Sequence, residues 1–155
     1  MQVLQQKLCL AAKTNPKRKF GVLYDKVCQI EVLWQAYKQV KANRGAPGID
    51  QQTFDYIERE IGLVTYLIDI QTKRIAKRYK PQPVKRVYIP KVDGTKRPIG
   101  IPVITDRIVQ DAVKMVIESL FEASFKDFSY GFRPEMNARQ ALGKPINGLI
   151  TSVTG

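Results

Sequence analysis

The sequence predicts an α+β protein that is mainly helical and contains one short, basic antiparallel hairpin. Residues 27–40 and 105–121 carry apolar side chains at helical spacing. Between them, two short segments rich in β-branched residues flank Asp93-Gly94, a strong hairpin-turn signal. The chain has 155 residues, 44% of them hydrophobic, which suffices for one domain with its own core or for part of a larger fold.

The positive charge is concentrated in one segment. The chain has 26 Lys and Arg against 14 Asp and Glu, a formal net charge of +12. Ten basic residues and one acid, Asp93, lie between Gln71 and Arg97, so this segment holds +9 of the total. Such a surface attracts a polyanion with closely spaced phosphates. Nucleic acid is therefore the first expected partner, and an anionic membrane surface is the second.

The composition excludes several classes of protein. With only Cys9 and Cys28 and no His, the chain can form neither a disulfide framework nor a zinc site. The opening MQVLQQKLCLAAK is too short and too polar for a signal peptide, and no later stretch approaches a membrane span. We expect a soluble, cytoplasmic protein with no membrane partner.

Residues 1–26 are expected to form a basic leader that is loosely structured or weakly helical. Its cluster Lys17-Arg18-Lys19 is either a solvated tail or a phosphate contact. A helix over residues 27–40 follows. Its apolar face consists of Val27, Ile30, Leu33, Trp34, Tyr37 and Val40. Because Trp34 belongs to this face, we expect it in the core and not as a base-stacking platform.

A glycine-rich loop separates this helix from a second one. The breaker cluster Asn43-Arg44-Gly45-Ala46-Pro47-Gly48 ends the first helix. Asp50, Thr53 and Asp55 are suitable start residues for the next helix, whose apolar positions are Phe54, Ile57 and Ile61. The pattern predicts helix, glycine loop, helix, followed by a polar and basic stretch from Thr72 to Lys80.

The hairpin is predicted between Pro83 and Pro102. A strand through Val84, Val87 and Ile89 precedes the Asp93-Gly94 turn, and residues 99–101 return as its partner. Residues 91–97 then form the tip, which projects basic side chains into solvent. A Lys point charge beside a planar Arg fork suits a triphosphate or a backbone phosphate. The alternative is a solvated hairpin whose charges prevent edge-strand aggregation.

The last clear helix starts near Thr105 and has a wide apolar face that should pack on the core. Asp106 and Asp111 lie on this helix, five residues apart. We expect Asp106 to cap the helix and Asp111 to be a surface or ion-pairing group.

Four segments in order resemble the N-terminal region of bacterial group II intron reverse transcriptases. They are residues 43–50 (NRGAPGID), 83–102 (PVKRVYIPKVDGTKRPIGIP), 105–111 (TDRIVQD) and 129–134 (SYGFRP). Four ordered motifs are far more specific than any single match. The resemblance covers residues 27–142 and implies the fingers and the beginning of the palm of a right-hand polymerase.

The resemblance also implies roles for individual residues. Lys91 and Arg97 match the fingertip pair that holds the triphosphate of the incoming nucleotide. Other positions match the template-binding surface: the glycine loop with Arg44 and Gly45, the base-packing Ile101 and Pro102, and the basic Arg86 and Arg133. Small residues in the loop would let backbone approach backbone or phosphate closely. Arg133 has a structural alternative, which is to brace the fingers against the palm.

The family's catalytic groups are missing from this sequence. Its polymerisation chemistry needs carboxylates that hold two Mg²⁺ ions, and the chain has no Asp-Asp pair and no Asp-x-Asp segment. We therefore expect no catalytic and no metal-binding residue here, and Mg²⁺ only in the complete enzyme. After residue 134 the sequence departs from the family, and residues 143–155 form a divergent tail, which suggests a truncation, a frameshift or a fragment.

The sequence is thus interpreted as a fragment of an RNA-directed DNA polymerase and maturase, a nucleotidyltransferase, that is inactive alone. Its expected partners are intron or template RNA, an RNA/DNA duplex and a deoxynucleoside triphosphate. A missing palm segment would leave the last helix uncovered, which predicts self-association or instability. The alternatives are a stand-alone, maturase-like RNA-binding module and an inert remnant whose charge only solubilises it.

Overall fold

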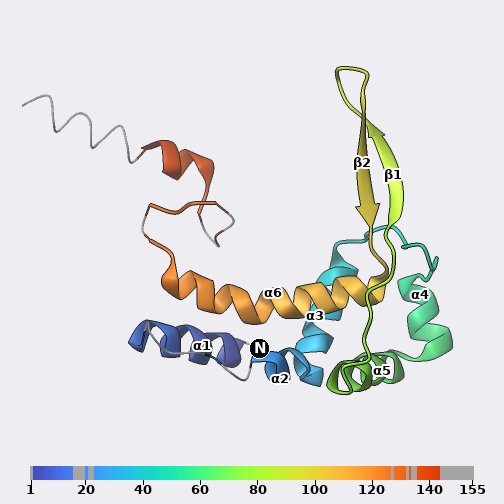
Figure 1. Cartoon of the computed structure of the whole chain (residues 1–155), viewed down its shortest axis with the longest axis horizontal. Helices are drawn as coiled ribbons and strands as arrows, with labels where there is room; N and C mark the ends of the chain where they lie inside the picture. The colour runs from blue at the N-terminus through green and yellow to red at the C-terminus, as the bar shows by residue number, and fades with distance from the viewer. Residues whose placement is uncertain are drawn as a thin grey trace, which may run out of the picture.

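The computed structural model describes residues 2–15, 20, 23–126, 128–131, 133 and 136–143. The helices form a layer, and a two-stranded hairpin rises from one end of it (Figure 1). The helices are α1 (Gln2–Thr14), α2 (Leu23–Val27), α3 (Ile30–Ala42), α4 (Phe54–Tyr56), the π-helical turn η1 (Ile57–Ile61), α5 (Leu63–Ile75) and α6 (Ile104–Ser124). The strands are β1 (Lys85–Pro90) and β2 (Lys96–Ile101). Across the described residues, the predicted α+β class is confirmed.

The central helix of the layer is α6, with 21 residues, and it packs against α1 and α3 (Figure 1). Apolar residues recur along it at helical spacing and face the core. The core comes mainly from α3, α5 and α6 and includes Val32, Leu33, Ala36, Tyr37, Val40, Ile57, Leu67, Ile70, Ile104, Ile108, Ala112 and Val116. Burial of each large aliphatic side chain contributes about 1.5–3 kcal/mol. The packing of α3, α5 and α6 in this core therefore dominates the stability of the fold.

The helix predicted over residues 27–40 is observed as α3, which begins at Ile30, whereas Val27 ends the separate helix α2; Trp34 was placed wrongly. The buried face of α3 consists of residues 32, 33, 36, 37 and 40. Trp34 lies beside this face with 39% of its surface exposed, and the Lys38 ammonium stands 5.5 Å from its ring centre. The two preceding residues, Val32 and Leu33, are buried and fill the core next to α3. The larger indole of Trp34 therefore remains at the surface.

The predicted order of helix, glycine loop, helix is confirmed. Thr53 caps α4, because its hydroxyl oxygen accepts a hydrogen bond from the Tyr56 amide at 3.2 Å. Gly62 has φ +82°, a left-handed conformation that favours glycine, and it ends η1. The helix α5 then runs into the stretch that the sequence pattern had indicated only as polar and basic. The beginning of that stretch is therefore the end of an amphipathic helix, and the buried face of this helix includes Leu67 and Ile70.

The leader is more ordered than expected in its first half. Residues 2–14 form α1, which lies along α6, and the Gln5 side-chain amide donates to the Met115 carbonyl at 3.3 Å. Leu4 and Leu8 pack against the core. Of the two alternatives for the leader, the helical one is observed in this part, and contacts with α6 stabilise it. The cluster Lys17-Arg18-Lys19 and the tail from residue 144 lie outside the described residues.

The hairpin has the predicted antiparallel pairing. Lys85 pairs with Ile101, Val87 with Ile99, and Ile89 with Arg97. In the described part of the chain no third strand joins this ribbon. Most of its side chains are exposed, and Val87, Ile99 and Ile101 are half-buried. Because a free two-stranded ribbon is only marginally stable, its attachment to the helical layer is important.

None of the described helices has both the length and the apolar composition that crossing a bilayer requires.

Candidate nucleic-acid interface

The hairpin tip is a tight turn whose acidic side chain forms hydrogen bonds within the turn. The Lys91 amide donates to the Thr95 carbonyl at 2.8 Å, and Gly94 adopts φ +79°. The Asp93 carboxylate accepts from the Thr95 hydroxyl at 2.6 Å and from the Thr95 amide at 2.9 Å. These two hydrogen bonds, the hydroxyl first, lower the pKa of Asp93 below its usual value. The one acidic side chain of the tip is therefore held within the turn.

The register places Lys91 and Arg97 on one face of the ribbon. Paired residues of an antiparallel ribbon share a face, and faces alternate along each strand. Arg97 pairs with Ile89, and Lys91 bonds to Thr95 one step nearer the tip, so the two basic side chains are diagonal neighbours. Both are exposed, and neither takes part in an ion pair with another described residue. This arrangement suits an anion that spans two adjacent cations.

The template-binding predictions divide between the two faces. Ile101 shares the face of Arg97 and is half-buried, as is Pro102. Arg86 pairs with Gly100 on the opposite face, where it is exposed. One strand of nucleic acid lying on a single face of the ribbon would not contact both Arg86 and Ile101. The contacts of these residues with nucleic acid stay predictions.

The glycine loop packs closely against α6. A Cβ atom on Gly45 would lie 2.5 Å from Nη1 of Arg107, and one on Gly48 would lie 2.6 Å from Cα of Val103. These two glycines therefore let the loop approach α6 and its N-cap residue closely. Arg44 follows α3 with φ +47° and is exposed. Of the two loop residues predicted to meet the template, Arg44 is open to solvent, whereas Gly45 is covered on its Cβ side.

Arg107 joins this loop to the end of the hairpin, and the sequence did not reveal its role. Its Nε donates to the Pro102 carbonyl at 2.9 Å, and its Nη2 donates to the Ala46 carbonyl. One side chain thereby fixes the loop and the strand exit relative to each other. The partners lie five and 61 residues away in the sequence, so local patterns give no signal for the second contact.

Asp106 anchors the segment that leads into β1 and is not a helix cap. The N-cap residue of α6 is Val103, and the Asp106 side chain is buried with 4% of its surface exposed. Its carboxylate accepts from the Tyr79 hydroxyl and from the Gln82 amide, the latter at 2.9 Å. Burial and the bond to this carboxylate raise the pKa of Tyr79 well above its usual value. The segment that enters β1 is thus tied to the first turn of α6.

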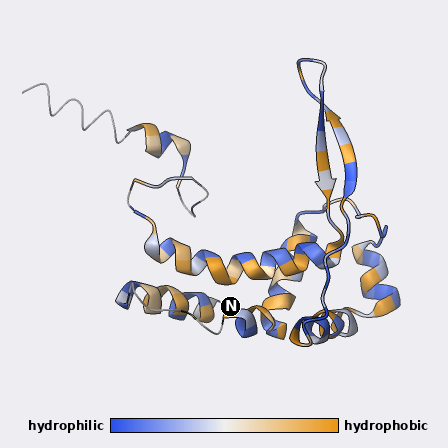
Figure 2. Ribbon diagram, in the orientation of Figure 1, coloured by the Kyte–Doolittle hydropathy of each residue, from blue (hydrophilic) through white to orange (hydrophobic). Residues whose placement is uncertain are grey.

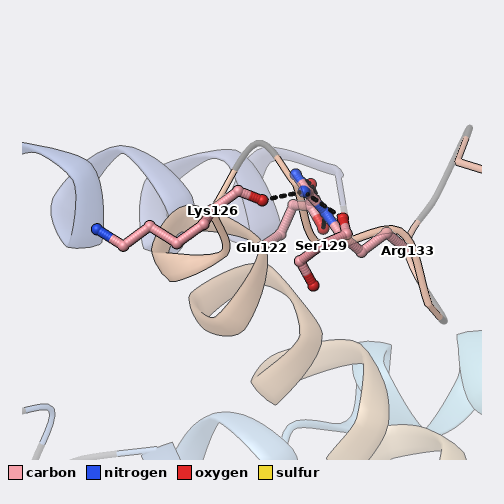
Figure 3. Close-up of polar contacts among 4 residues, drawn as sticks. All are labelled: Glu122, Lys126, Ser129 and Arg133. Carbon is pink, nitrogen blue, oxygen red and sulfur yellow. Dashed lines mark hydrogen bonds and ion pairs between the residues drawn. The ribbon is translucent and has the colours of Figure 1, made fainter. Parts of the chain in front are cut away.

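Arg133 is surrounded by its own chain, as Figure 3 shows. Its guanidinium lies 2.6 Å from the Glu122 carboxylate and donates to the carbonyls of Lys126 and Ser129 at 3.0 and 2.9 Å. Its side chain is 9% exposed and stacks on the Phe125 ring. These contacts hold the segment after α6 against the end of that helix; whether Arg133 braces fingers against palm is not tested by them. A template contact by Arg133 stays an untested prediction.

The Glu122 to Arg133 pair predicts a pH dependence of stability. Hydrogen bonds from Arg133 lower the pKa of Glu122 below its usual 4.5. A carboxylate whose folded pKa is depressed adds stability above its unfolded pKa and loses it as pH falls through the folded pKa. Thermal unfolding between about pH 6 and about pH 3 should therefore show a smaller acid-induced loss for Arg133→Gln than for the unchanged chain.

Two further variants control this measurement. Glu122→Gln removes the titrating group and should show the same reduced loss as Arg133→Gln. Glu118 lies on the same helix and has no hydrogen bond or ion pair with the described residues. Glu118→Gln should keep the original pH dependence. Equal acid sensitivity in all four proteins would show that the pair does not contribute.

The described residues contain no group of three or more His, Cys, Asp or Glu side chains that could hold a metal ion. Asp111 has an oxygen that is buried without a hydrogen-bond partner, and burial raises its pKa. It forms no ion pair within the described chain, contrary to one of the two expectations for it.

Comparison with known proteins identifies relatives over most of the chain. The protein YkfC of Escherichia coli K12 is 35% identical over 141 residues, which are 90% of this chain and 36% of YkfC. The group II intron-encoded protein LtrA of Lactococcus lactis is 36% identical over 135 residues, 84% of this chain and 22% of LtrA. A putative COX1/OXI3 intron 2 protein of Saccharomyces cerevisiae is 31% identical over 115 residues, 73% of this chain and 13% of that protein.

No protein-family model matches the chain. The chain spans little more than a third of the shortest of these three relatives and less than a quarter of the other two. The aligned length nevertheless includes most of the region that carries the four motifs, and two of the three relatives are intron-encoded proteins by name. The chain therefore belongs to the family of group II intron-encoded proteins and corresponds to a part of their length.

Proposed function

We propose that the chain is the fingers and early palm of an RNA-directed DNA polymerase and maturase of group II intron type. In this role it binds an RNA template and the triphosphate of an incoming deoxynucleotide. The observation that carries the proposal is the pair Lys91 and Arg97, two exposed cations that lie on one face of the hairpin by the strand register and the Lys91 to Thr95 backbone hydrogen bond. The homology to group II intron-encoded proteins supports it.

The remaining predicted residues take the following roles in this proposal. Ile101 and Pro102 press on the templating base from the strand exit. Arg44 meets the template backbone from the glycine loop, with Gly45 keeping the loop close to Arg107. Arg86 contacts RNA on the other face of the ribbon.

Catalysis is proposed to depend on groups outside this chain. The complete polymerase would use Mg²⁺ held by carboxylates, and the described residues offer no set that fits such an ion. The chain alone is therefore proposed to bind RNA, an RNA/DNA duplex and nucleotide without performing the transfer. A cytoplasmic location is part of this proposal.

A stand-alone RNA-binding module is the second candidate, and the exposed basic surface favours it equally. It predicts binding to RNA and indifference to deoxynucleotides. Self-association is also compatible with the surface, because Phe121 and Phe125 at the end of α6 are 57% and 40% exposed and stack with ring centres 6.3 Å apart.

The test is the double variant Lys91→Ala/Arg97→Ala. Removing two phosphate contacts should reduce the salt slope of single-stranded RNA binding by about 1.4, since each contact contributes about 0.7. Binding of a deoxynucleoside triphosphate should weaken by at least about tenfold, because each charged hydrogen bond is worth about 1.5–3 kcal/mol. Fluorescence anisotropy measures the RNA binding and calorimetry the nucleotide binding.

The control Lys7→Ala/Lys13→Ala removes the same charge from α1, at the end of the layer opposite the hairpin (Figure 1). It should leave the salt slope and the nucleotide affinity nearly unchanged. If the tip variant and this control behave alike, the proposed role of the tip is wrong. RNA binding that depends on the tip without any nucleotide binding would favour the stand-alone module.

A further inference from the structure

A hollow of about 580 Å³ lies at the root of the hairpin, between residues 50–52, α5 and the segment that leads from α5 to β1. This segment is strongly hydrophilic (Figure 2). The hollow has the volume of a small-molecule binding site, which is about 300–1,000 Å³. Its charged lining consists of Asp50, Asp69, Lys73, Arg78, Lys80 and Asp106. The residues of the hairpin tip, Lys91 and Arg97, do not line it.

Three of these charges, Asp50, Arg78 and Lys80, are not taken up by an ion pair or by two hydrogen bonds within the described residues. Lys73 pairs with Asp69 at 2.5 Å, and Asp106 is occupied by Tyr79 and Gln82. The side chains of Arg78 and Lys80 are exposed and form neither an ion pair nor a hydrogen bond within the described chain. The Asp50 carboxylate accepts only the Gln52 amide, at 3.3 Å. The hollow therefore presents two available cations and one available carboxylate.

The backbone holds Asp50 in place at the edge of the hollow. Gly48, two residues earlier, packs on the Val103 backbone. Gln51, the residue after Asp50, has φ +58°, a left-handed conformation that a residue with a side chain adopts at a cost. Its amide donates to the Gly48 carbonyl at 3.3 Å. The strained conformation of Gln51 and the packing of Gly48 together fix the backbone on both sides of Asp50.

We propose that this hollow binds one nucleotide of an RNA strand, with Arg78 and Lys80 on its phosphate and the Asp50 carboxylate accepting a hydrogen bond from the ribose 2′-hydroxyl. Arg and Lys bind phosphate oxygens. An ionised carboxylate only accepts hydrogen bonds, so beside a phosphate it is favourable only where the ligand supplies a donor. The 2′-hydroxyl is such a donor, and DNA lacks it.

This inference rests on the proposal that the chain binds RNA, and it adds a site that distinguishes RNA from DNA. The test compares the 155-residue chain's affinity for labelled single-stranded RNA and DNA of matched sequence. The unchanged chain should prefer RNA by about tenfold, the worth of one hydrogen bond to a charged group. Asp50→Asn keeps the bond to Gln52 but replaces the carboxylate by a weaker, neutral acceptor. It should reduce the preference to about threefold or less.

Asp25→Asn is the matched control, because Asp25 is exposed on α2, does not line the hollow, and loses the same charge. Both variants gain affinity for all nucleic acid from the lost negative charge, so only the ratio of RNA to DNA affinity is informative. The ratio should change in Asp50→Asn and stay constant in Asp25→Asn. Equal RNA and DNA binding by the unchanged chain, or equal ratios in the two variants, would overturn the inference.

The phosphate contacts are tested with Arg78→Gln/Lys80→Gln against Lys7→Gln/Lys13→Gln. The first pair should reduce the salt slope by about 1.4 for both RNA and DNA, and the second should leave it unchanged. If the chain binds no RNA at all, the proposed function fails as well. If the tip variant alters the salt slope and the hollow variants alter neither slope nor ratio, only the present inference fails.

Discussion

Gly48→Ala is expected to destabilise the fold by about 3 kcal/mol, at the upper end of the usual cost of overpacking. The added Cβ would lie 2.6 Å from Cα, 2.8 Å from N and 2.9 Å from Cγ1 of Val103. Two of these atoms are backbone, and Val103 is fully buried at the start of α6, so the neighbour cannot move aside. At this chain length the unfolding midpoint should fall by roughly 6–12 °C.

Gly131→Ala is the control for this prediction. A Cβ at Gly131 would meet nothing within 4 Å, and Gly131 is not among the residues with positive φ. Its unfolding midpoint should stay within about 2 °C of the unchanged chain, as for most surface substitutions. A Gly48→Ala midpoint equal to that of Gly131→Ala would mean that the glycine loop does not pack on α6 as described.

Asp106→Ala is expected to cost about 3 kcal/mol, because two hydrogen bonds to a charged group are lost at about 1.5 kcal/mol each. The Tyr79 hydroxyl and the Gln82 amide lose their acceptor, and the segment before β1 is released from α6. The thermal midpoint should fall, and amide exchange should accelerate first in residues 79–90. That order follows because strand β1 joins no described strand other than β2.

Asp111→Ala is the matched control on the same helix. Asp111 has no hydrogen-bonded or ionic partner among the described residues, and one of its carboxylate oxygens is buried. Removing an unpartnered carboxylate whose pKa burial raises should cost little or should stabilise slightly. Both variants place Ala in a helix, so the difference in propensity largely cancels. If the two variants unfold alike, the carboxylate of Asp106 does not anchor the hairpin.

The hairpin could be predicted from the sequence because its determinants are local. Asp93 and Gly94 specify the turn, and β-branched residues with flanking prolines define the strands. The helix after the glycine loop was predictable for the same reason, since Thr53 caps it within one turn. Local chemistry also indicated that Lys91 and Arg97 lie near the tip, and the observed register agrees with that.

Features that depend on distant partners could not be predicted in this way. Helical spacing placed Trp34 on the apolar face, but only the packing of α3 on α6 decides which edge of that face is buried. The helix α1 is stabilised by α6, which lies some hundred residues away. Asp106 and Arg107 are adjacent in the sequence, yet their partners at residues 79, 82 and 46 come from three separate positions along the chain.

The first turn of α6 has a consequence for motion. Its consecutive residues Asp106 and Arg107 form hydrogen bonds with the segment that enters the hairpin and with the segment that leaves it. Arg107 also donates to the glycine loop. A hairpin attached to the helical layer through one strand only could change its orientation easily. This hairpin is attached to α6 through both strands, so its orientation is coupled to that of the helix. With 21 residues, α6 is a rod about 31 Å long at 1.5 Å per residue. Displacement of the tip would therefore act on the first turn of α6, which is packed in the core, and not on a free loop.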